Sequence, residues 1–327
     1  MSPSVTCSTS FDGIADEWSS FLSRCVVNTP FQTPQWQRAW LRELGNCEPP
    51  CLLRFVDDGQ VLGMASLRAS NGSITFVGDE DVCDYNDFLV PKEKESPFYE
   101  AFIEYLGQRE WNTLRLYSLA QNSPTLAHLP DLARSRGYNV EISQEEVSPG
   151  KMLPKTWDDY LASLTKKDRH ELKRKLRRLD SAEEVSWYGL TELDDIEKGM
   201  DDFLRLLKMS KEDKHRFLTP ERERFFRAIA AELGEMGVLS LYFMEMGGKR
   251  VASALTFDYG SSRMLYNSGY NPEYGYYSVG LLLNALTLKS AIEEGKAYFD
   301  FLRGDEPYKY HLGGVDRPVY TMVVTKS

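Results

Sequence analysis

Ionisable side chains gather where an aromatic strand ends, in the segment "YFDFLRGDEPYKYHLGG" at residues 298–314. The run at 298–302 alternates like a buried strand and carries an aspartate inside it. Carboxylate, phenol and ammonium groups at such a place can transfer protons or bind charged groups. Ordinary loops need no aspartate within the strand and no charge cluster beyond it, so the pattern indicates a site. Its candidate residues are Asp300, Arg303, Asp305, Tyr308 and Lys309.

A second stretch, "NSGYNPEYGYYSVGLLLNAL", favours an anion site at the start of a helix. A strand is expected to end near Tyr270, and a helix is expected to open at Ser278 after a loop rich in Gly and Tyr. Gly280 falls in the first turn, where free N–H groups and the positive end of the helix dipole suit a pyrophosphate. The alternative, a purely structural Gly280, stays open on these residues alone. The candidate cofactor-binding residues are Ser268, Gly269, Ser278, Val279 and Gly280.

Other kinds of active site fit the sequence poorly. There is no G-x-S-x-G elbow and no glycine pattern of the Walker or dinucleotide type. All five cysteines precede residue 84, whereas the candidate site lies after residue 260. Cys47 and Cys51 have no histidine close in sequence, so we expect reduced thiols and no metal site.

Length and composition predict a globular chain of two domains. The 327 residues are 42% hydrophobic and 12% aromatic, and they suffice for two domains of about 150 residues each. The net charge of −10 argues against non-specific nucleic-acid binding, so no DNA partner is expected. The start "MSPSVTCSTS" lacks a signal-peptide pattern, and the longest apolar stretch is broken by Asn284 and Lys289. We therefore expect no membrane span and a cytoplasmic location.

The pattern of elements divides the chain at a linker-like segment, "SPGKMLPKT", into 1–150 and 151–327. In the first half, "FQTPQWQRAWLRELG" predicts a helix with Thr33 as its N-cap and Pro34 at its first position. A β-meander, helices and strands follow. The second half repeats this order, ending with a helix from Ser278 to about Glu294 and the strands "AYFDFL" and "PVYTMVVT". The repetition indicates a duplicated α+β fold.

Taken together, these segments resemble the GNAT superfamily of acyl-CoA-dependent N-acyltransferases, in its double-domain CelD-like or FemAB-like branch. The likeness covers most of the chain and implies an α+β fold of tandem GNAT-like domains, each a mixed, mostly antiparallel sheet flanked by helices. The usual pyrophosphate loop begins with Gln or Arg and has more glycine than "NPEYGYYSVG", so cofactor contacts would rest on the helix N-terminus. The residues that carry the likeness are "FQTPQWQRAWLRELG", "DYNDFLV" (84–90), "KKDRHELKRKLRRL", "SVGLLLNALTLKSAIEEG" and, most specifically, 298–314.

The resemblance also implies the chemistry of the site. It places "AYFDFL" beside "MLYNSGY", with the thioester of acetyl-CoA or another acyl-CoA in the gap between the two strands. Amine acylation needs a proton acceptor for the amine and a proton donor for the leaving thiolate. Asp305 or Asp300 would serve as the acceptor and Tyr308 as the donor. Arg303 and Lys309 would bind an anionic group of the substrate or pair with the aspartates. The alternative is an Asp300–Arg303 ion pair that only holds the strand end.

Two further charged segments have open interpretations. The resemblance places Asp84 and Tyr85 at the interdomain cleft, where they would contact the acceptor; the alternative is a solvated acidic loop. The helix at 166–178 holds eight Lys/Arg and two Asp/Glu, a net charge of about +6. It could meet tRNA phosphates, CoA phosphates or an anionic glycan, or it could dock on the acidic remainder of the protein.

Three functions therefore compete. The first is an acyl-CoA-dependent N-acyltransferase for a small-molecule amine, with CoA bound by 151–327 and the acceptor site shaped by a cofactor-free 1–150. The second is an aminoacyl-tRNA-dependent transferase of the FemAB type, although 157–180 is too short for the long helical insertion usual in those proteins. The third is a non-catalytic GNAT-like binding module in polysaccharide assembly. The residues indicate neither acyl length nor oligomeric state.

Overall fold

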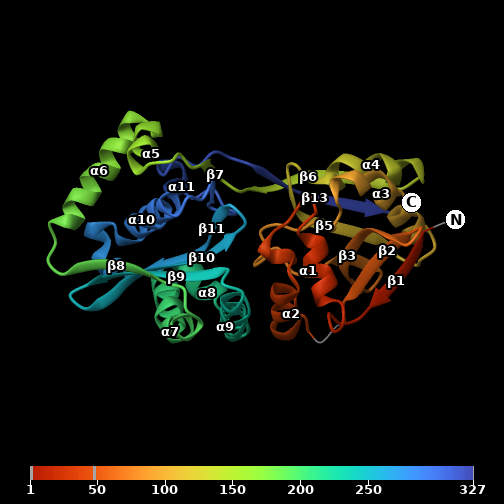
Figure 1. Ribbon diagram of the computed structural model, residues 1–327, viewed down its shortest axis with the longest axis horizontal. Coiled ribbons are helices and arrows are strands. Elements are labelled where there is room, and N and C mark those ends of the chain that lie inside the picture. The colour runs from red at the N-terminus through yellow and green to blue at the C-terminus, as the bar shows by residue number, and fades with distance from the viewer. Residues whose placement is uncertain (1–2, 47–48, 327) are drawn as a thin grey trace. The chain divides into compact units, whose positions relative to one another are not determined.

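The computed structural model describes residues 3–46 and 49–326, and the chain divides into two units (Figure 1). Unit 1 comprises Met1–Glu146 and Arg317–Ser327, and unit 2 comprises Val147–Asp316. The division expected from the sequence, 1–150 and 151–327, gave the last strand to the second half. In the structure this strand instead pairs with a strand of unit 1.

Unit 1 is built on a mixed sheet whose described strands lie in the order β1-β2-β3-β4-β5-β13-β6. β4 and β5 are parallel over three residue pairs, whereas the pairs β1–β2, β2–β3, β3–β4 and β5–β13 are antiparallel. The elements of this unit are β1 Ser4–Ser8, α1 Ala15–Leu22, η1 Pro30–Gln32, α2 Pro34–Glu43, β2 Cys51–Asp57, β3 Gln60–Ser70, β4 Ser73–Phe76, η2 Lys92–Lys94, α3 Glu95–Gly107, β5 Thr113–Ala120, α4 Pro124–Ser135, β6 Asn139–Val147 and β13 Pro318–Thr325.

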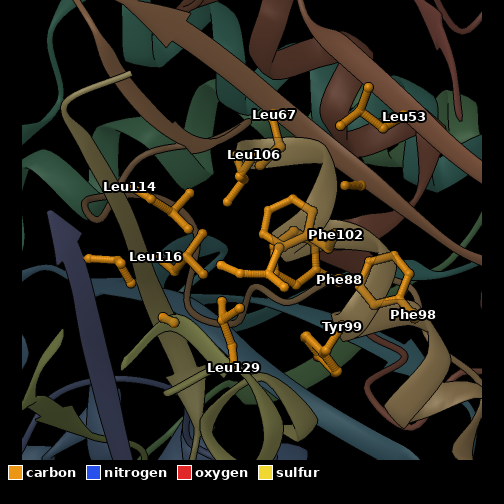
Figure 2. Close-up of a cluster of buried hydrophobic side chains, with 14 of the residues drawn as sticks. Leu53, Leu67, Phe88, Phe98, Tyr99, Phe102, Leu106, Leu114, Leu116 and Leu129 are labelled. Atoms are coloured by element: carbon orange, nitrogen blue, oxygen red, sulfur yellow. The ribbon is translucent and has the colours of Figure 1, made fainter. Parts of the chain in front are cut away.

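The core of unit 1 lies on both faces of this sheet because strand side chains alternate between faces. Leu53 and Phe55 of β2 join a large cluster with α3 and α4, in which Phe88, Phe98 and Phe102 pack ring against ring (Figure 2). Leu52, the neighbour of Leu53 in the sequence, points to the other face and belongs to a second cluster that includes Trp18 of α1. The two clusters hold helices against opposite faces.

Unit 2 repeats this plan with a sheet in the order β7-β12-β11-β10-β9-β8. β9, β10 and β11 form the antiparallel meander, and β12 is parallel to β11 over three residue pairs, as β5 is to β4. Its described elements are β7 Gly150–Met152, α5 Trp157–Ser163, α6 Lys166–Asp180, β8 Val185–Leu190, α7 Leu193–Ser210, α8 Glu212–Phe217, α9 Pro220–Glu235, β9 Leu239–Met246, β10 Lys249–Tyr259, β11 Ser262–Tyr270, η3 Pro272–Tyr277, α10 Val279–Glu293, β12 Tyr298–Asp300 and α11 Pro307–His311.

Helices cover both faces of the second sheet. α10 lies on one face, and α7 and α9 lie on the other (Figure 1). Tyr242 and Met244 of β9 pack in the cluster with α10, whereas Phe243 faces Gly199 of α7. α10 has ten buried residues, Asn284 and Thr287 among them, because α5 and α6 pack against it in addition to the sheet. Across residues 3–46 and 49–326, the structure contains no helix that combines the length and apolar character needed to cross a membrane.

Local signals in the sequence correctly located several helix ends. Thr33 caps α2 by accepting a hydrogen bond from the Trp36 N–H, and Pro34 is the first helical residue. α10 begins directly after Ser278, and Gly295 follows its C-terminus with a positive φ of 75°. The strand expected at "AYFDFL" is shorter, because β12 ends at Asp300.

A β-bulge in β11 decides which side chains of this strand face which helix. Leu255 of β10 is opposite Asn267, and Thr256 is opposite Leu265, so Tyr266 is an extra residue. Past the bulge, Ser268 faces α10, where its Oγ accepts from Asn284 Nδ2 at 3.4 Å. Gly269 faces α7, and a Cβ there would lie 2.4 Å from the backbone of Leu206. Gly269 therefore allows β11 and α7 to approach closely.

Replacing Gly269 by Ala should destabilise unit 2 by about 1–3 kcal/mol, because the added methyl meets helix backbone that cannot rotate away. Urea denaturation measures the loss. Gly275→Ala is the matched control, since a Cβ at Gly275 meets nothing within 4 Å. Equal stability of the two variants would show that Gly269 is not a packing residue.

Candidate active site

The N-terminus of α10 presents an unusual cap. Ser278 adopts the left-handed conformation (φ 57°, ψ 38°), and its side chain makes no hydrogen bond to its own helix. Its Oγ instead accepts a hydrogen bond from Lys175 Nζ of α6 at 2.7 Å. The first N–H groups of a helix lack intrahelical partners, and the dipole makes this end positive. Lys175 adds a cation to the same place.

Val279 and Gly280, predicted to contact a cofactor, have packing roles in the structure. Val279 is fully buried in the core cluster of unit 2. A Cβ on Gly280 would lie 2.8 Å from Cδ1 of Tyr270, at the end of β11. Gly280 thus lets the Tyr270 ring rest on the first turn of α10. This contact supports the structural interpretation of Gly280, while the backbone N–H groups beside it remain suited to an anion.

β12 separates from β11 after only three residue pairs. The last pair joins Met264 to Asp300, and β11 continues to Tyr270. Beyond Asp300 the chain follows a different neighbour, because the Phe301 N–H donates to Pro149 O at 2.9 Å. Among the described strands, none pairs with this side of β11 past Met264. The sheet therefore has an open strand edge leading toward the start of α10.

The turn that ends β12 is held from within. Asp300 is only 2% exposed, and its Oδ1 accepts the Leu302 N–H at 2.8 Å. Leu302 has a positive φ of 57°, a conformation that non-glycine residues seldom adopt. The carboxylate of Asp300 thus supports a strained turn and lies inside the protein.

Lys309, predicted to bind substrate, is a structural residue in this arrangement. Its side chain is 2% exposed, and Nζ donates to the carbonyl oxygens of Leu302 at 2.9 Å, Arg303 at 2.5 Å and Gly304 at 3.0 Å. Nζ also lies 3.0 Å from Glu306 Oε2. Four acceptors surround three N–H groups, so nothing is left for a ligand. Burial opposes ionisation of Glu306, but Lys309 outweighs it and lowers the pKa of that carboxyl.

The remaining candidates of the 298–314 segment differ in exposure. Asp305 is exposed, and Arg303 is half-buried. Tyr308 is partly buried, with its ring against Phe301 at 6.4 Å between centroids. Burial, with Glu306 second, raises the pKa of the Tyr308 phenol well above its usual value. Asp305 is therefore the candidate carboxylate that a substrate can reach most directly.

One cation near the open edge of β11 was missed from the sequence. Lys214 of α8 is partly buried, and its Nζ donates a hydrogen bond to the Ser268 carbonyl. The segment "KEDKHRF" around it resembles any charged helix surface, and only the tertiary structure brings it to β11.

The basic helix α6 packs beside the N-terminus of α10. Leu172 and Leu179 bury its apolar side, and Arg178 lies over the Tyr276 ring at 4.7 Å. A cavity of about 220 Å³ opens between α6, the first turn of α10 and α11. Its lining residues are Lys167, Asp168, Glu171, Leu172, Lys175, Leu281, His311 and Leu312. Lys175, one of the cations of α6, therefore lies at the predicted anion site. The sequence alone had left four possible partners for this helix: tRNA, CoA, an anionic glycan or the protein itself.

Residues 166–310 match the family model described as "Acetyltransferase (GNAT) domain". Unit 2 is a GNAT domain. This GNAT domain in unit 2 bears out the prediction of an N-acyltransferase. No curated protein matches the sequence.

Solved structures extend the likeness beyond the GNAT domain. The structure described as FemX has a TM-score of 0.66 at 13% identity, covering 94% of this chain and 95% of that one. The tandem GNAT protein from the clavulanic acid biosynthesis pathway has a TM-score of 0.55 at 12% identity and covers 99% of each chain. L-PGS from Bacillus licheniformis gives 0.56 at 13% identity, covering 95% and 91%. At such identities the likeness concerns the fold, and it confirms the predicted tandem GNAT-like architecture.

Outside the GNAT domain, the predicted acceptor-contact residues lie in a largely buried segment. Tyr85 is 3% exposed and packs edge-on against Phe31 at 6.3 Å, whereas Asp84 is half-buried. The alternative of a solvated acidic loop does not fit this burial. Asp87, which was not predicted, is 2% exposed and accepts hydrogen bonds from Ser123 Oγ at 2.5 Å and from Thr125 Oγ1.

Within the described residues, the cysteines and other metal-ligating side chains form no candidate metal site. Cys7, Cys25, Cys51 and Cys83 are free thiols, and Cys47 lies outside the described residues. No group of three or more His, Cys, Asp or Glu that could hold a metal occurs within residues 3–46 and 49–326.

Asp87 predicts a pH dependence of stability. Burial outweighs the hydrogen bonds and raises the pKa of this carboxyl from 3.8 to about 6. The folded state therefore holds a proton that the unfolded chain releases, so the Asp87 contribution to stability falls as the pH rises from about 4 to 6. The full effect is about 3 kcal/mol, of which about 2 kcal/mol falls between pH 4.5 and 7.5. It is measured as the difference in unfolding free energy between wild type and Asp87→Asn at pH 4.5 and 7.5.

The exposed Asp131 of the same unit supplies the control for this titration. Wild type and Asp131→Asn should differ by a nearly constant free energy at the two pH values. A pH-independent difference for Asp87→Asn as well would mean that the carboxyl titrates normally in the folded state.

Proposed function

We propose that this protein transfers an acyl group from acyl-CoA to the amine of a small acceptor. Acetyl-CoA is the proposed donor, and an amino sugar or an amino-acid-like metabolite is the proposed acceptor. The observation that carries the proposal is the open edge of β11 leading to the positive N-terminus of α10. An extended pantetheine arm can add to a strand edge, and a pyrophosphate suits a helix N-terminus.

The residues at the start of α10 fit the CoA pyrophosphate. The backbone N–H groups of Val279 and Gly280 supply donors, and the first turn contains no acidic residue. Lys175 Nζ, bonded to Ser278 Oγ, supplies a cation that can reach the phosphates. Ser268 and Gly269 would flank the arm through their backbone, because the Gly269 side-chain position is closed by α7. These backbone groups, together with the Lys175 side chain, are proposed to replace the missing glycine cradle.

Asp305 is the proposed acceptor of the amine proton. It is exposed just after the turn that follows β12, which Asp300 and Lys309 stabilise through hydrogen bonds. Asp300 acts as a positioning residue in this scheme, since its carboxylate is committed to Leu302. Arg303 is the cation of this segment proposed to meet an anionic group of the acceptor.

Unit 1 is proposed to bind no CoA and to contribute the half-buried Asp84 to acceptor recognition, with the buried Tyr85 supporting that segment from below. Its helix after the meander, α3, corresponds in order to α10. α3 carries Glu95 in its first turn, and this carboxylate disfavours a pyrophosphate there. No such charge opposes an anion at α10.

A second candidate, transfer from an aminoacyl-tRNA, draws on the exposed cations of α6. Lys166, Lys167 and Lys173 are all exposed on this helix. The helix has only 15 residues, and part of it is committed to α10. Thermal-shift measurements with acetyl-CoA, longer acyl-CoAs and charged tRNA distinguish the two donors, and stabilisation by tRNA alone would favour the second.

Calorimetric titration should show one CoA bound per chain. Lys175→Met should weaken this binding by about tenfold or more, because a charge-assisted hydrogen bond to phosphate is lost. Lys173→Met, on the exposed side of the same helix, should leave the affinity nearly unchanged. Two CoA molecules per chain, or equal affinities of the two variants, would contradict the placement.

Asp305→Asn should lower turnover by roughly 10²–10⁴-fold, the usual effect of losing a general base. CoA release from acetyl-CoA is followed with a panel of amino sugars and amino acids. Higher pH should partly restore the rate, since more amine then arrives deprotonated, and CoA affinity should not change. The exposed Asp316→Asn is the control. Full activity of Asp305→Asn, or a loss that only tracks unfolding, would remove Asp305 from the mechanism.

A further inference from the structure

Lys214 places an ammonium group at the open edge of β11. Its Nζ donates to the carbonyl of Ser268, four residues beyond Met264, the last residue of β11 that pairs with β12. The carbonyl belongs to the part of the strand left without a neighbour where the two strands separate. The ammonium therefore lies along the path proposed above for the acyl-CoA arm.

This ammonium has unused hydrogen-bonding capacity. A lysine carries three N–H donors, and within the part of the chain that the structure describes Lys214 has one hydrogen-bond acceptor, the Ser268 carbonyl. Lys309, by contrast, is surrounded by four acceptors. Partial burial of a cation with two free N–H groups is costly unless a ligand supplies acceptors. A thioester supplies a carbonyl oxygen and, as it breaks, a thiolate.

The surroundings of Lys214 lower the pKa of its ammonium group. Burial is the largest influence and, helped by the cations of Lys211 and Lys309, lowers the pKa of Lys214 to about 8, while Glu306 opposes this shift. An ordinary thiol has a pKa of about 8.5. Proton transfer between groups of similar pKa near the working pH is the efficient case for general acid catalysis.

We propose that Lys214 is the catalytic proton donor to the CoA thiolate, a role that rests on the acyl-CoA-dependent function proposed above. The acceptor amine attacks the thioester carbon, the C–N bond forms, and the C–S bond breaks. The sulfur leaves with the electron pair and takes a proton from the Lys214 ammonium. The excess proton of the amine goes to Asp305, and solvent reprotonates Lys214 before the next cycle.

The same role was predicted for Tyr308, and the geometry favours Lys214. The phenol is packed against Phe301, and its raised pKa makes it a weak acid. Lys214 instead donates directly to the strand edge along which the thioester arm is proposed to lie.

The test uses the capacity of neutral Lys214 to become acylated when no acceptor is present. The full-length protein is incubated with acetyl-CoA between pH 6.5 and 9.5, and acetyl groups are located by peptide mass spectrometry. Lys214 Nζ then attacks the thioester, and CoA leaves as the thiol. Lys214 should be labelled about tenfold faster than the exposed Lys211, with a midpoint near pH 8.

Two further measurements distinguish a failure of the Lys214 proposal from a failure of the acyl-CoA-dependent function on which it rests. Calorimetry with CoA is done on the wild type and on Lys214→Arg, which keeps the charge and the bond to Ser268 but cannot release its proton near neutral pH. Both should bind CoA with affinities within about threefold. In ¹³C-lysine NMR, the signal lost in Lys214→Arg should titrate near pH 8 in the wild type.

Each result decides the matter. CoA binding without preferential labelling of Lys214, or a titration midpoint near 10.5, overturns the role of Lys214 and leaves the proposed function standing. No CoA binding to the wild type overturns both. CoA binding together with labelling that rises through pH 8 supports both.

Discussion

A buried ammonium holds the chain where it leaves the sheet of unit 2. Lys309 Nζ gathers the carbonyl oxygens of three successive residues, 302–304, and the carboxylate of Glu306. Without these acceptors the charge would be prohibitively expensive to bury, and without the charge the three carbonyls would converge with no donor. Asp300 completes the turn by accepting the Leu302 N–H. The turn directs the chain away from β11, and the open strand edge depends on this diversion.

The bulge at Tyr266 adds a second constraint to the same strand. Because side chains alternate strictly along a strand, one extra residue exchanges the faces of all residues beyond it. Ser268 consequently meets α10, and Gly269 meets α7, where only a hydrogen atom fits. α8, which carries Lys214, follows α7 directly in the chain. Packing on one face of β11 thus positions the cation at its edge.

Local signals were sufficient to predict several helices, and the family resemblance predicted the overall fold, but neither predicted the partners of individual residues. Thr33, Pro34 and Gly295 mark helix ends through short-range chemistry, so the ends of α2 and α10 could be predicted. The roles of Lys309 and Gly269 depend on which atoms surround them. The type and position of Lys309 predict a ligand-binding cation. Its actual contacts are the carbonyl oxygens of a turn that no local sequence pattern predicts. The pairing of β13 with β5 of unit 1 could not be predicted, because strands that are far apart in the sequence carry no local signal of their pairing.

The two units share a topology but differ at the place where a phosphate would bind. In both, an antiparallel meander leads to a helix and then to a strand that is parallel to the last meander strand over three residue pairs. In unit 1 that helix begins with Glu95, whose carboxylate lies 3.0 Å from His128 Nε2. In unit 2 it begins without an acidic residue and beside Lys175. An acidic side chain in the first turn already occupies the favourable interaction with the helix dipole, whereas a lysine adds to the attraction for an anion. Duplication of the fold therefore need not duplicate the cofactor site, because the charge of a few side chains at one helix end decides which copy can hold a pyrophosphate.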